Sequence, residues 1–147
     1  MKIAVASDEK TYLTDFVVAE LEKRGHEPVL FGPLVGDDLP WTLASEQLAL
    51  SVANGEADQG VLFCYTGTGA SMVANKVRGI RAALCADAET ARGAKWWNNA
   101  NVLVMSLRAT SPEIATEILD AWFSEQVRPE EKVFIDQFEE IDNKYAK

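Results

Sequence analysis

Residues 60–69 read Gly60-Val61-Leu62-Phe63-Cys64-Tyr65-Thr66-Gly67-Thr68-Gly69, an apolar run that ends in a thiol, hydroxyl groups and glycines. The segment Ala70–Val77 that follows has helical character. A strand that enters a helix through such a turn places reactive side chains beside free backbone N–H groups. These donors can hold an anion or stabilise negative charge that develops during a reaction. The stretch therefore predicts a strand–turn–helix unit with a candidate reactive group at Cys64.

Apolar runs and helical patterns alternate along the rest of the chain. Short apolar runs, typical of strands buried on both faces, are found at Ile3–Ala6, Pro28–Phe31, Gly60–Cys64, Ile80–Cys85 and Asn101–Met105. Helical spacing and capping residues predict helices at Leu13–Arg24, Trp41–Ala53, Ala70–Val77, Ala88–Trp97 and from Pro112 onward, after an N-cap at Ser111. This alternation predicts an α/β fold, a three-layer sandwich in which helices cover both faces of a five-stranded, Rossmann-like parallel sheet.

The chain length fits one domain over residues 1–147, since 147 residues with 48% hydrophobic content can bury a full core. A charged helical extension begins at about residue 128 and runs to 147, with Val133, Phe134, Phe138 and Ile141 spaced along one helix face. We expect this terminal helix to pack on its own domain or on a partner subunit.

The charge balance excludes several classes of partner. The chain has 14 basic and 23 acidic residues, for a net charge of −9. This argues against nucleic acid and acidic membranes, which attract basic surfaces. The two cysteines are too few for a disulfide scaffold, and no apolar run approaches the ~20 residues of a membrane span. We expect a cytoplasmic protein without a signal peptide.

Polar residues follow the predicted strands. In a doubly wound sheet, ligands bind at the carboxyl ends of the strands. That edge would gather Ser7-Asp8-Glu9, Cys64–Gly69, Asp87 and Ser106-Leu107-Arg108. We expect the segment Trp96-Trp97-Asn98-Asn99 to line the same edge, with the two tryptophans either shaping the site or packing at a helix end.

The chain resembles the family of ribose-5-phosphate isomerase B and the galactose-6-phosphate isomerase subunits, from residue 1 to about 126. The resemblance is carried by Lys2-Ile3-Ala4 with Ser7-Asp8, Gly55-Glu56-Ala57-Asp58, Cys64-x-Thr66-Gly67-x-Gly69, Ala74-Asn75-Lys76-Val77-x-Gly79-Ile80-Arg81-Ala82-Ala83-Leu84-Cys85, Thr90-Ala91-Arg92 and Asn98-x-Ala100-Asn101-Val102-Leu103.

The resemblance implies an aldose–ketose isomerase that works through an enediolate without a metal or other cofactor. Cys64 would be the base that moves a proton between C1 and C2, and Thr66 would assist ring opening. The substrate would be bound by Asp8, Glu9, Gly67, Thr68, Gly69, Asn98 and Arg108. Cys85 matches no catalytic position. The family is dimeric or tetrameric, with sites at the subunit boundary, so the resemblance also implies a homodimer or tetramer.

The departures from the family pattern concern ring opening and phosphate binding. Glu9 stands where many members have histidine, and Trp97 replaces the histidine that opens the sugar ring. The only histidine, His26, is expected at the domain surface or boundary, far from the site. The tail Arg128-Pro129-Glu130-Glu131-Lys132 places an acid at or near a phosphate-binding arginine. A carboxylate there would repel a phosphate dianion, whereas arginine would bind it in a bidentate manner.

Three functions therefore remain open. The first is isomerisation of a phosphorylated pentose or hexose. The second is the same chemistry on a non-phosphorylated sugar or an open-chain keto-uronate, whose carboxylate Arg108 could hold. The third is a non-catalytic subunit of a hetero-oligomeric isomerase. Dinucleotide binding is set aside, because Met72 stands where the third glycine of that fingerprint belongs.

Overall fold

Five parallel strands form the central sheet of the computed structural model, which describes residues 1–147. The strands are β1 (Lys2–Ser7), β2 (Glu27–Leu30), β3 (Gln59–Cys64), β4 (Ala82–Leu84) and β5 (Val102–Ser106). They lie in the order β2-β1-β3-β5-β4, and every neighbouring pair is parallel. The three central strands are nearly continuous apolar runs because both of their faces are covered.

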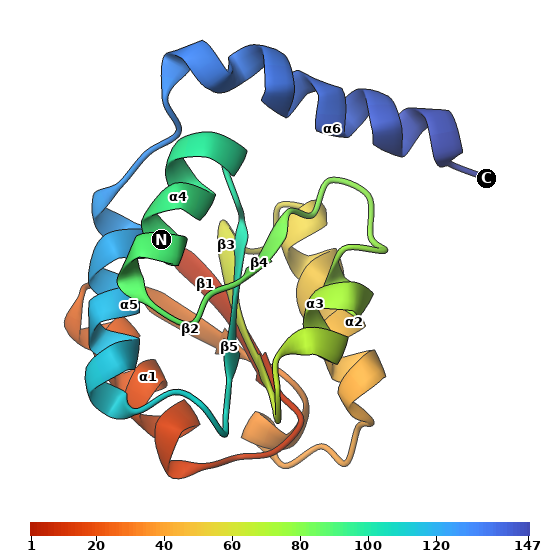
Figure 1. Cartoon of the computed structure of the whole chain (residues 1–147). Coiled ribbons are helices and arrows are strands. Elements are labelled where there is room, and N and C mark those ends of the chain that lie inside the picture. Colours follow the sequence, from red (N-terminus) through yellow and green to blue (C-terminus); the bar gives the residue numbers. More distant parts are fainter.

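Helices cover both faces of the sheet and complete the three layers (Figure 1). The six α-helices are α1 (Tyr12–Lys23), α2 (Trp41–Ala53), α3 (Thr68–Ala74), α4 (Ala88–Asn98), α5 (Pro112–Ser124) and α6 (Lys132–Tyr145), and short 3-10 turns lie at Gly32–Val35 and Pro129–Glu131. Residues of α1, α4 and α5 share one core cluster with the sheet, and residues of α2 and α3 share the other. The predicted α/β fold is confirmed.

Local hydrogen bonds explain where the first turns of two helices lie. Ser111 accepts a hydrogen bond at its hydroxyl from the N–H of Ile114 (3.1 Å), which confirms the predicted N-cap of α5. Asp87 caps α4 in the same way, through the N–H of Thr90 (2.7 Å). This bond, above all, holds the pKa of the Asp87 carboxyl below its usual value. Asp87 therefore has a structural task at the edge where a binding role was considered.

The boundaries of α3 and β4 differ from the prediction. The helix ends at Ala74 instead of Val77, and β4 has three residues instead of the six from Ile80 to Cys85. The side chain of Asn75 donates to the carbonyl of Ala82 (2.9 Å) and accepts from its N–H (2.8 Å). Asn75 is the C-cap residue of α3, and its side chain ties the end of this helix to Ala82, the first residue of β4.

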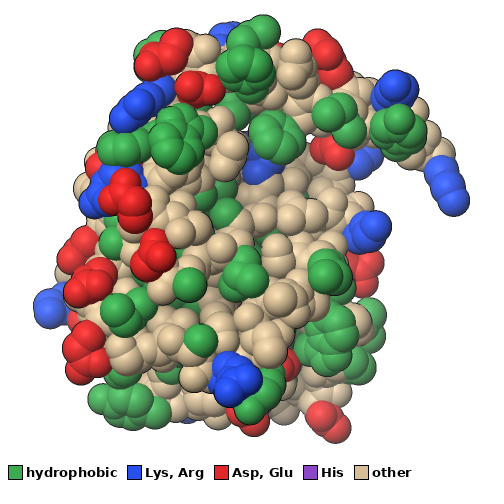
Figure 2. Space-filling view, in the orientation of Figure 1, with side chains coloured by type: hydrophobic (Ala, Val, Ile, Leu, Met, Phe, Trp, Pro, Cys, Tyr) green, Lys and Arg blue, Asp and Glu red, His purple; other side chains and the backbone are tan.

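The terminal helix α6 lies apart from the sheet, at the end where β4 and β5 begin (Figure 1). None of its residues is buried. It is attached through Asp142, which accepts from the N–H of Gly79 (2.9 Å), and through Asn143, which accepts from Arg78. Apolar side chains gather along the helix in the upper part of Figure 2. They include Val133, Phe134, Phe138 and Ile141, each at least 41% exposed.

The helix predicted for the extension is therefore present, and its apolar face is uncovered within one chain. None of the helices combines the length and apolar content needed to cross a bilayer.

Candidate active site

Three segments meet at the carboxyl edge of the sheet. The ends of β1, β3 and β5 lie level there, since Ser7 pairs with Phe63 and Cys64 with Ser106. Between them and the start of α2 lies a cavity of about 270 Å³. Its lining residues are Asp8, Trp41, Cys64, Tyr65, Thr66, Thr68 and Gly69. The fold thus gathers the predicted reactive group and several predicted binding residues in one place.

Cys64 is the last residue of β3 and is 7% exposed. Its Sγ accepts a hydrogen bond from the N–H of Gly67 at 3.1 Å. A thiolate acts as the basic form of cysteine, and backbone donors around sulfur are the usual surroundings of reactive thiols. The cavity gives a small molecule access to this sulfur.

Gly67 makes the turn possible. Its φ of 85° lies in the left-handed region, which side chains disfavour. A Cβ there would also meet Leu84 Cδ1 at 2.4 Å and the backbone of Met105 and Ser106 at 3.4 Å. Because the Gly67 N–H is used by Cys64, the N–H groups of Thr68 and Gly69 in the first turn of α3 are the donors left for a ligand.

Hydroxyl groups and one carboxylate complete the cavity. Thr66 Oγ1 and Thr68 Oγ1 lie 2.8 Å apart, and both residues are exposed. Asp8 Oδ2 accepts from the N–H of Tyr65 (3.1 Å). Asp8 Oδ1 is buried and has no hydrogen-bond partner. A buried acceptor without a donor is costly, so the Asp8 carboxyl carries one unsatisfied oxygen beside the cavity.

Arg108 and Glu9 lie beside this cavity rather than in its wall. The Arg108 N–H donates to the carbonyl of Tyr65 (3.1 Å), and its guanidinium carbon lies 5.7 Å from the Tyr65 ring centre. Ser106 donates its hydroxyl to the same carbonyl (3.0 Å). Glu9 is exposed, and its backbone is held by Ser7. Arg108 is therefore a cation next to Tyr65, one of the residues that line the cavity.

Asn98 does not reach this cavity within one chain. The helix α4 begins after the carboxyl end of β4 and returns to the opposite edge, where β5 begins (Figure 1). The expectation that segment 96–99 lines the carboxyl edge of the sheet is therefore wrong within one chain. A substrate-binding role of Asn98 stays a prediction that requires a second copy.

The two tryptophans of segment 96–99 differ in their contacts and exposure. Trp96 donates its indole N–H to Glu125 Oε2 (2.5 Å), and the Arg128 guanidinium lies 4.1 Å from its ring centre. Trp96 thus has the packing role that was one of the two alternatives. Trp97 is 50% exposed and contacts Gly93 of its own helix.

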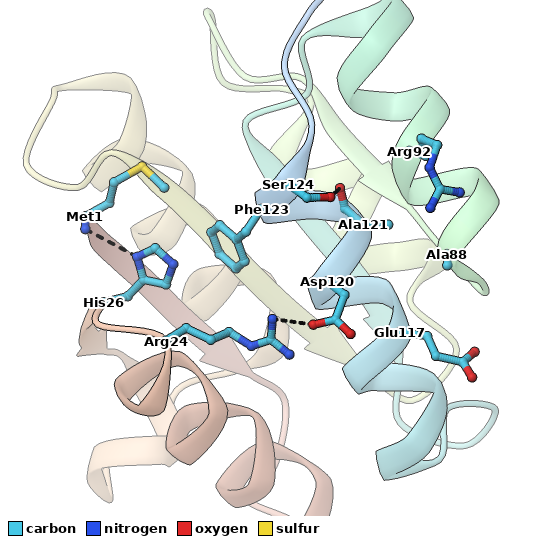
Figure 3. Close-up of a pocket in the computed structure, with 10 residues that line it drawn as sticks. All are labelled: Met1, Arg24, His26, Ala88, Arg92, Glu117, Asp120, Ala121, Phe123 and Ser124. Atoms are coloured by element: carbon cyan, nitrogen blue, oxygen red, sulfur yellow. Dashed lines mark hydrogen bonds and ion pairs between the residues drawn. The ribbon is translucent and has the colours of Figure 1, made fainter.

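A larger cavity of about 770 Å³ lies away from this edge, among α1, α4 and α5 (Figure 3). Its arginines are paired with carboxylates, Arg24 with Asp120 (2.6 Å) and Arg92 with Glu89 (2.7 Å). His26 is half-buried there, stacked on Phe123 at 4.3 Å between ring centres, and burial lowers the pKa of its imidazole. His26 is a boundary residue, as predicted.

Two contributors to the cavity were missed from the sequence. Trp41 opens α2, and its ring lies against Gly69, while Tyr65 holds Asp8 and the Arg108 segment through its backbone. Tyr65 lay within the motif, so its backbone role could have been anticipated. Trp41 is far from the motif along the chain, and no local pattern marks it. No cluster of His, Cys, Asp and Glu side chains is arranged as a metal site.

Comparisons with known proteins assign the family. The ribose/galactose isomerase family model matches residues 3–137. The chain is 35% identical to the ribose-5-P isomerase B of Listeria innocua, across 98% of this chain and 99% of that protein. The chain belongs to the ribose/galactose isomerase family.

Other members of the ribose/galactose isomerase family agree with this assignment. The D-erythrulose-4-phosphate isomerase of Pectobacterium atrosepticum is 36% identical, across 81% of this chain and 76% of that protein. The structure of Clostridium thermocellum ribose-5-phosphate isomerase B matches with a TM-score of 0.91 and 33% identity, across 99% of this chain and 100% of that one. The predicted family, fold and isomerase class of enzyme are confirmed.

Proposed function

We propose that this chain interconverts the aldose and ketose forms of a sugar phosphate, with Cys64 as the base. The observation that carries the proposal is the Cys64 sulfur, which accepts the Gly67 N–H (3.1 Å) in a cavity where Asp8 Oδ1 is buried without a partner. Cys64 is suited to move a proton, and the carboxyl of Asp8, a residue of the cavity wall, is suited to hold a sugar hydroxyl.

The reaction is written with Cys64 as thiolate. The sulfur takes the proton from the carbon next to the substrate carbonyl, and the electron pair moves to the carbonyl oxygen to give an enediolate. The N–H groups of Thr68 and Gly69 are placed to donate to this negative oxygen. The thiol then returns its proton to the neighbouring carbon, while one proton moves between the two oxygens. The Thr66 and Thr68 hydroxyls, 2.8 Å apart, are suited to relay that proton.

The charged end of the substrate is assigned to Arg108. Its guanidinium lies next to Tyr65, one of the cavity residues. An arginine can hold a phosphate or a carboxylate through two parallel hydrogen bonds. This leaves the non-phosphorylated keto-uronate as an alternative to the sugar phosphate, since both carry a suitable anion.

An acyclic sugar phosphate is the second candidate within the same chemistry. The chain has one histidine, and it is half-buried against Phe123 instead of lying in the cavity. A four-carbon ketose phosphorylated at O4 has no free hydroxyl that can close a stable ring, so it needs no group for ring opening. The Pectobacterium relative is named for such a compound, D-erythrulose 4-phosphate.

We further propose that the working unit is a homodimer or a higher homo-oligomer. Asn98 lies at the edge opposite the cavity, and α6 exposes its apolar face there. Pairing the two opposite edges of two copies would bring the partner's Asn98 toward Cys64 and cover α6.

Proton NMR in D2O tests the chemistry. The panel contains erythrose 4-phosphate, ribose 5-phosphate, allose 6-phosphate, galactose 6-phosphate, the free sugars and an open-chain keto-uronate. We expect deuterium to enter at the carbon next to the carbonyl, and Cys64→Ala to reduce the rate at least about a hundredfold. Cys85→Ala is the matched control, because it removes the other thiol, which does not line the cavity, and it should retain exchange.

The outcomes separate the alternatives. The substrate that exchanges fastest decides among cyclic sugar phosphates, acyclic ones and uronates. Exchange that survives Cys64→Ala removes cysteine as the base. A folded protein that exchanges no member of the panel contradicts the proposal and supports a non-catalytic subunit.

A further inference from the structure

Trp41 belongs to the cavity but to none of the strands that end there. It is the first residue of α2, and its ring lies on the first turn of α3. A Cβ on Gly69 would lie 2.8 Å and 2.9 Å from two ring carbons of Trp41. Only a glycine leaves room for the ring at this position. Gly69, the second glycine of the turn, therefore leaves room for a tryptophan ring beside Cys64.

The ring is not held there by the core. Trp41 is 43% exposed and belongs to neither core cluster, although Ala44 and Leu48 of the same helix are fully or almost fully buried. Its backbone is fixed, since the buried Ser45 donates its hydroxyl to the Trp41 carbonyl (2.7 Å). A large, partly exposed aromatic surface is thus presented to the cavity from a fixed backbone position.

We propose that Trp41 is the specificity-determining residue of this site and restricts it to short, extended sugar chains. The inference rests on the isomerase function proposed above. The indole forms an apolar wall against which the C–H bonds of the carbon chain lie. The polar groups of the same cavity, Asp8, Thr66 and Thr68, remain available for the hydroxyls.

The wall is rigid toward α3. The ring already contacts the backbone position of Gly69, so it cannot retreat in that direction to admit a bulkier molecule. The cavity of about 270 Å³ is the space that remains with the ring in place. An extra carbon or a ring conformer that lies along this wall would contact the indole. A shorter acyclic chain does not, and it gains the apolar contact.

Steady-state kinetics with Trp41→Ala and Trp41→Phe test the inference. The substrates are erythrose 4-phosphate, ribose 5-phosphate and allose 6-phosphate, with four, five and six carbons. We expect Trp41→Ala to lower kcat/KM for the shortest substrate roughly tenfold, mainly through KM, because apolar contact is lost. The six-carbon to four-carbon ratio of kcat/KM should rise at least about tenfold, and Trp41→Phe should lie between.

Leu43→Ala is the matched control. Leu43 lies on the same turn of α2, is 46% exposed and does not line the cavity. It should leave the ratio unchanged. A uniform loss across all three substrates with Trp41→Ala, or the same change with Leu43→Ala, would overturn the inference and leave Trp41 a structural role only.

Binding measurements distinguish a failure of this inference from a failure of the proposed isomerase function on which it rests. The same three compounds are titrated by calorimetry against Cys64→Ser, with and without Trp41→Ala. Chain-length preference that disappears with Trp41→Ala supports the inference even if turnover is absent. Preference that persists overturns it. If Cys64→Ser and the unaltered chain bind none of the three, the sugar-phosphate function itself fails and the inference fails with it.

Discussion

Two cysteines of this chain lie at the carboxyl ends of strands, yet their surroundings differ. Cys64 lines a cavity and receives a backbone N–H at its sulfur (3.1 Å). Cys85 is fully buried, and its thiol lies 3.6 Å from the carbonyl of Ala83, to which it donates. Burial raises the pKa of Cys85 to about 12. Cys85 thus keeps its proton in the folded chain and packs in the core, which fits its lack of a match to any catalytic position.

At Gly67, both the backbone conformation and the close packing require a glycine. We expect Gly67→Ala to destabilise the fold by about 2 kcal/mol, from a left-handed φ and a Cβ too close to Leu84. The turn would shift to relieve the contact, so the N–H donors around Cys64 would lose their alignment. We therefore expect exchange in D2O to fall about a hundredfold. Urea unfolding and NMR measure the two effects.

Gly25→Ala is the matched control for that change. Gly25 has a φ of 86°, against 85° for Gly67, but nothing lies within 4 Å of its added Cβ. Gly25→Ala should lower the free energy of unfolding by the conformational cost alone, about 1 kcal/mol. It should leave the rate of deuterium exchange into the substrate unchanged. Equal losses for the two variants would show that the close approach at Leu84 has no consequence.

At the scale of elements, side-chain hydrogen bonds fix both ends of α4. Asp87 caps its start, and two cations hold its end. Lys95 donates to the carbonyl of Ala100 (3.0 Å), and Arg81 donates to the carbonyl of Asn99 (2.8 Å). Asn99 has a φ of 46°, the left-handed conformation common at helix ends. These bonds fix the point at which the chain turns into β5.

Lys95 predicts a pH dependence of stability. Burial first, and then the charge of Arg81, lower the pKa of Lys95 from 10.5 to about 8. Below pH 8 both folded and unfolded chains are protonated, and the folded state carries the full cost of the buried charge. As pH rises from 8 towards 10.5 the folded state releases the proton first, so stability rises in this window.

The variant Lys95→Met isolates this effect. Between pH 7 and pH 9, the unaltered chain should gain about 1 kcal/mol of unfolding free energy relative to Lys95→Met, measured by urea titration. The unfolded thiol of Cys85 also ionises in this range, with the opposite effect on stability, but this contribution is common to both chains and cancels in the comparison. Lys23→Met, on an exposed lysine, is the control and should show the slope of the unaltered chain. A Lys95→Met slope equal to that of the unaltered chain would contradict the prediction.

At the scale of the whole molecule, the uncovered apolar face of α6 supports the proposed second copy. A helix with no buried residue and an exposed apolar face is costly in water. We predict that Phe134→Glu combined with Ile141→Glu converts the oligomer to a monomer. Both side chains are 57% exposed, so the domain itself should remain folded. Exchange should fall at least about tenfold, because the partner's Asn98 is removed from the site.

Sedimentation velocity, with circular dichroism for the fold, measures the outcome. Glu140→Gln is the control, since Glu140 is an exposed polar residue of the same helix. The mass of this variant in solution should equal that of the unaltered chain. An oligomer that persists in the double variant would exclude the apolar face of α6 as the subunit contact.

The sequence by itself determined the layers and the reactive turn. Apolar runs separated by helical spacing leave few ways to bury both faces of every strand, so the α/β sandwich followed from periodicity. Cys64 and Gly67 could be placed because a strand, a turn and a helix lie within one short segment, where backbone geometry is local. The same locality made the Ser111 cap predictable.

The tertiary structure alone decided which distant residues meet. The strand order β2-β1-β3-β5-β4 brings together segments that are far apart in sequence. The same is true of the contact between the Trp41 ring and Gly69, and of the hydrogen bond from the Tyr65 N–H to Asp8. It also placed Asn98 at the edge opposite Cys64, since α4 runs antiparallel to its strands. Periodicity states that a residue is buried or exposed, but not which neighbour it faces. Those contacts follow only from the packing of the whole chain.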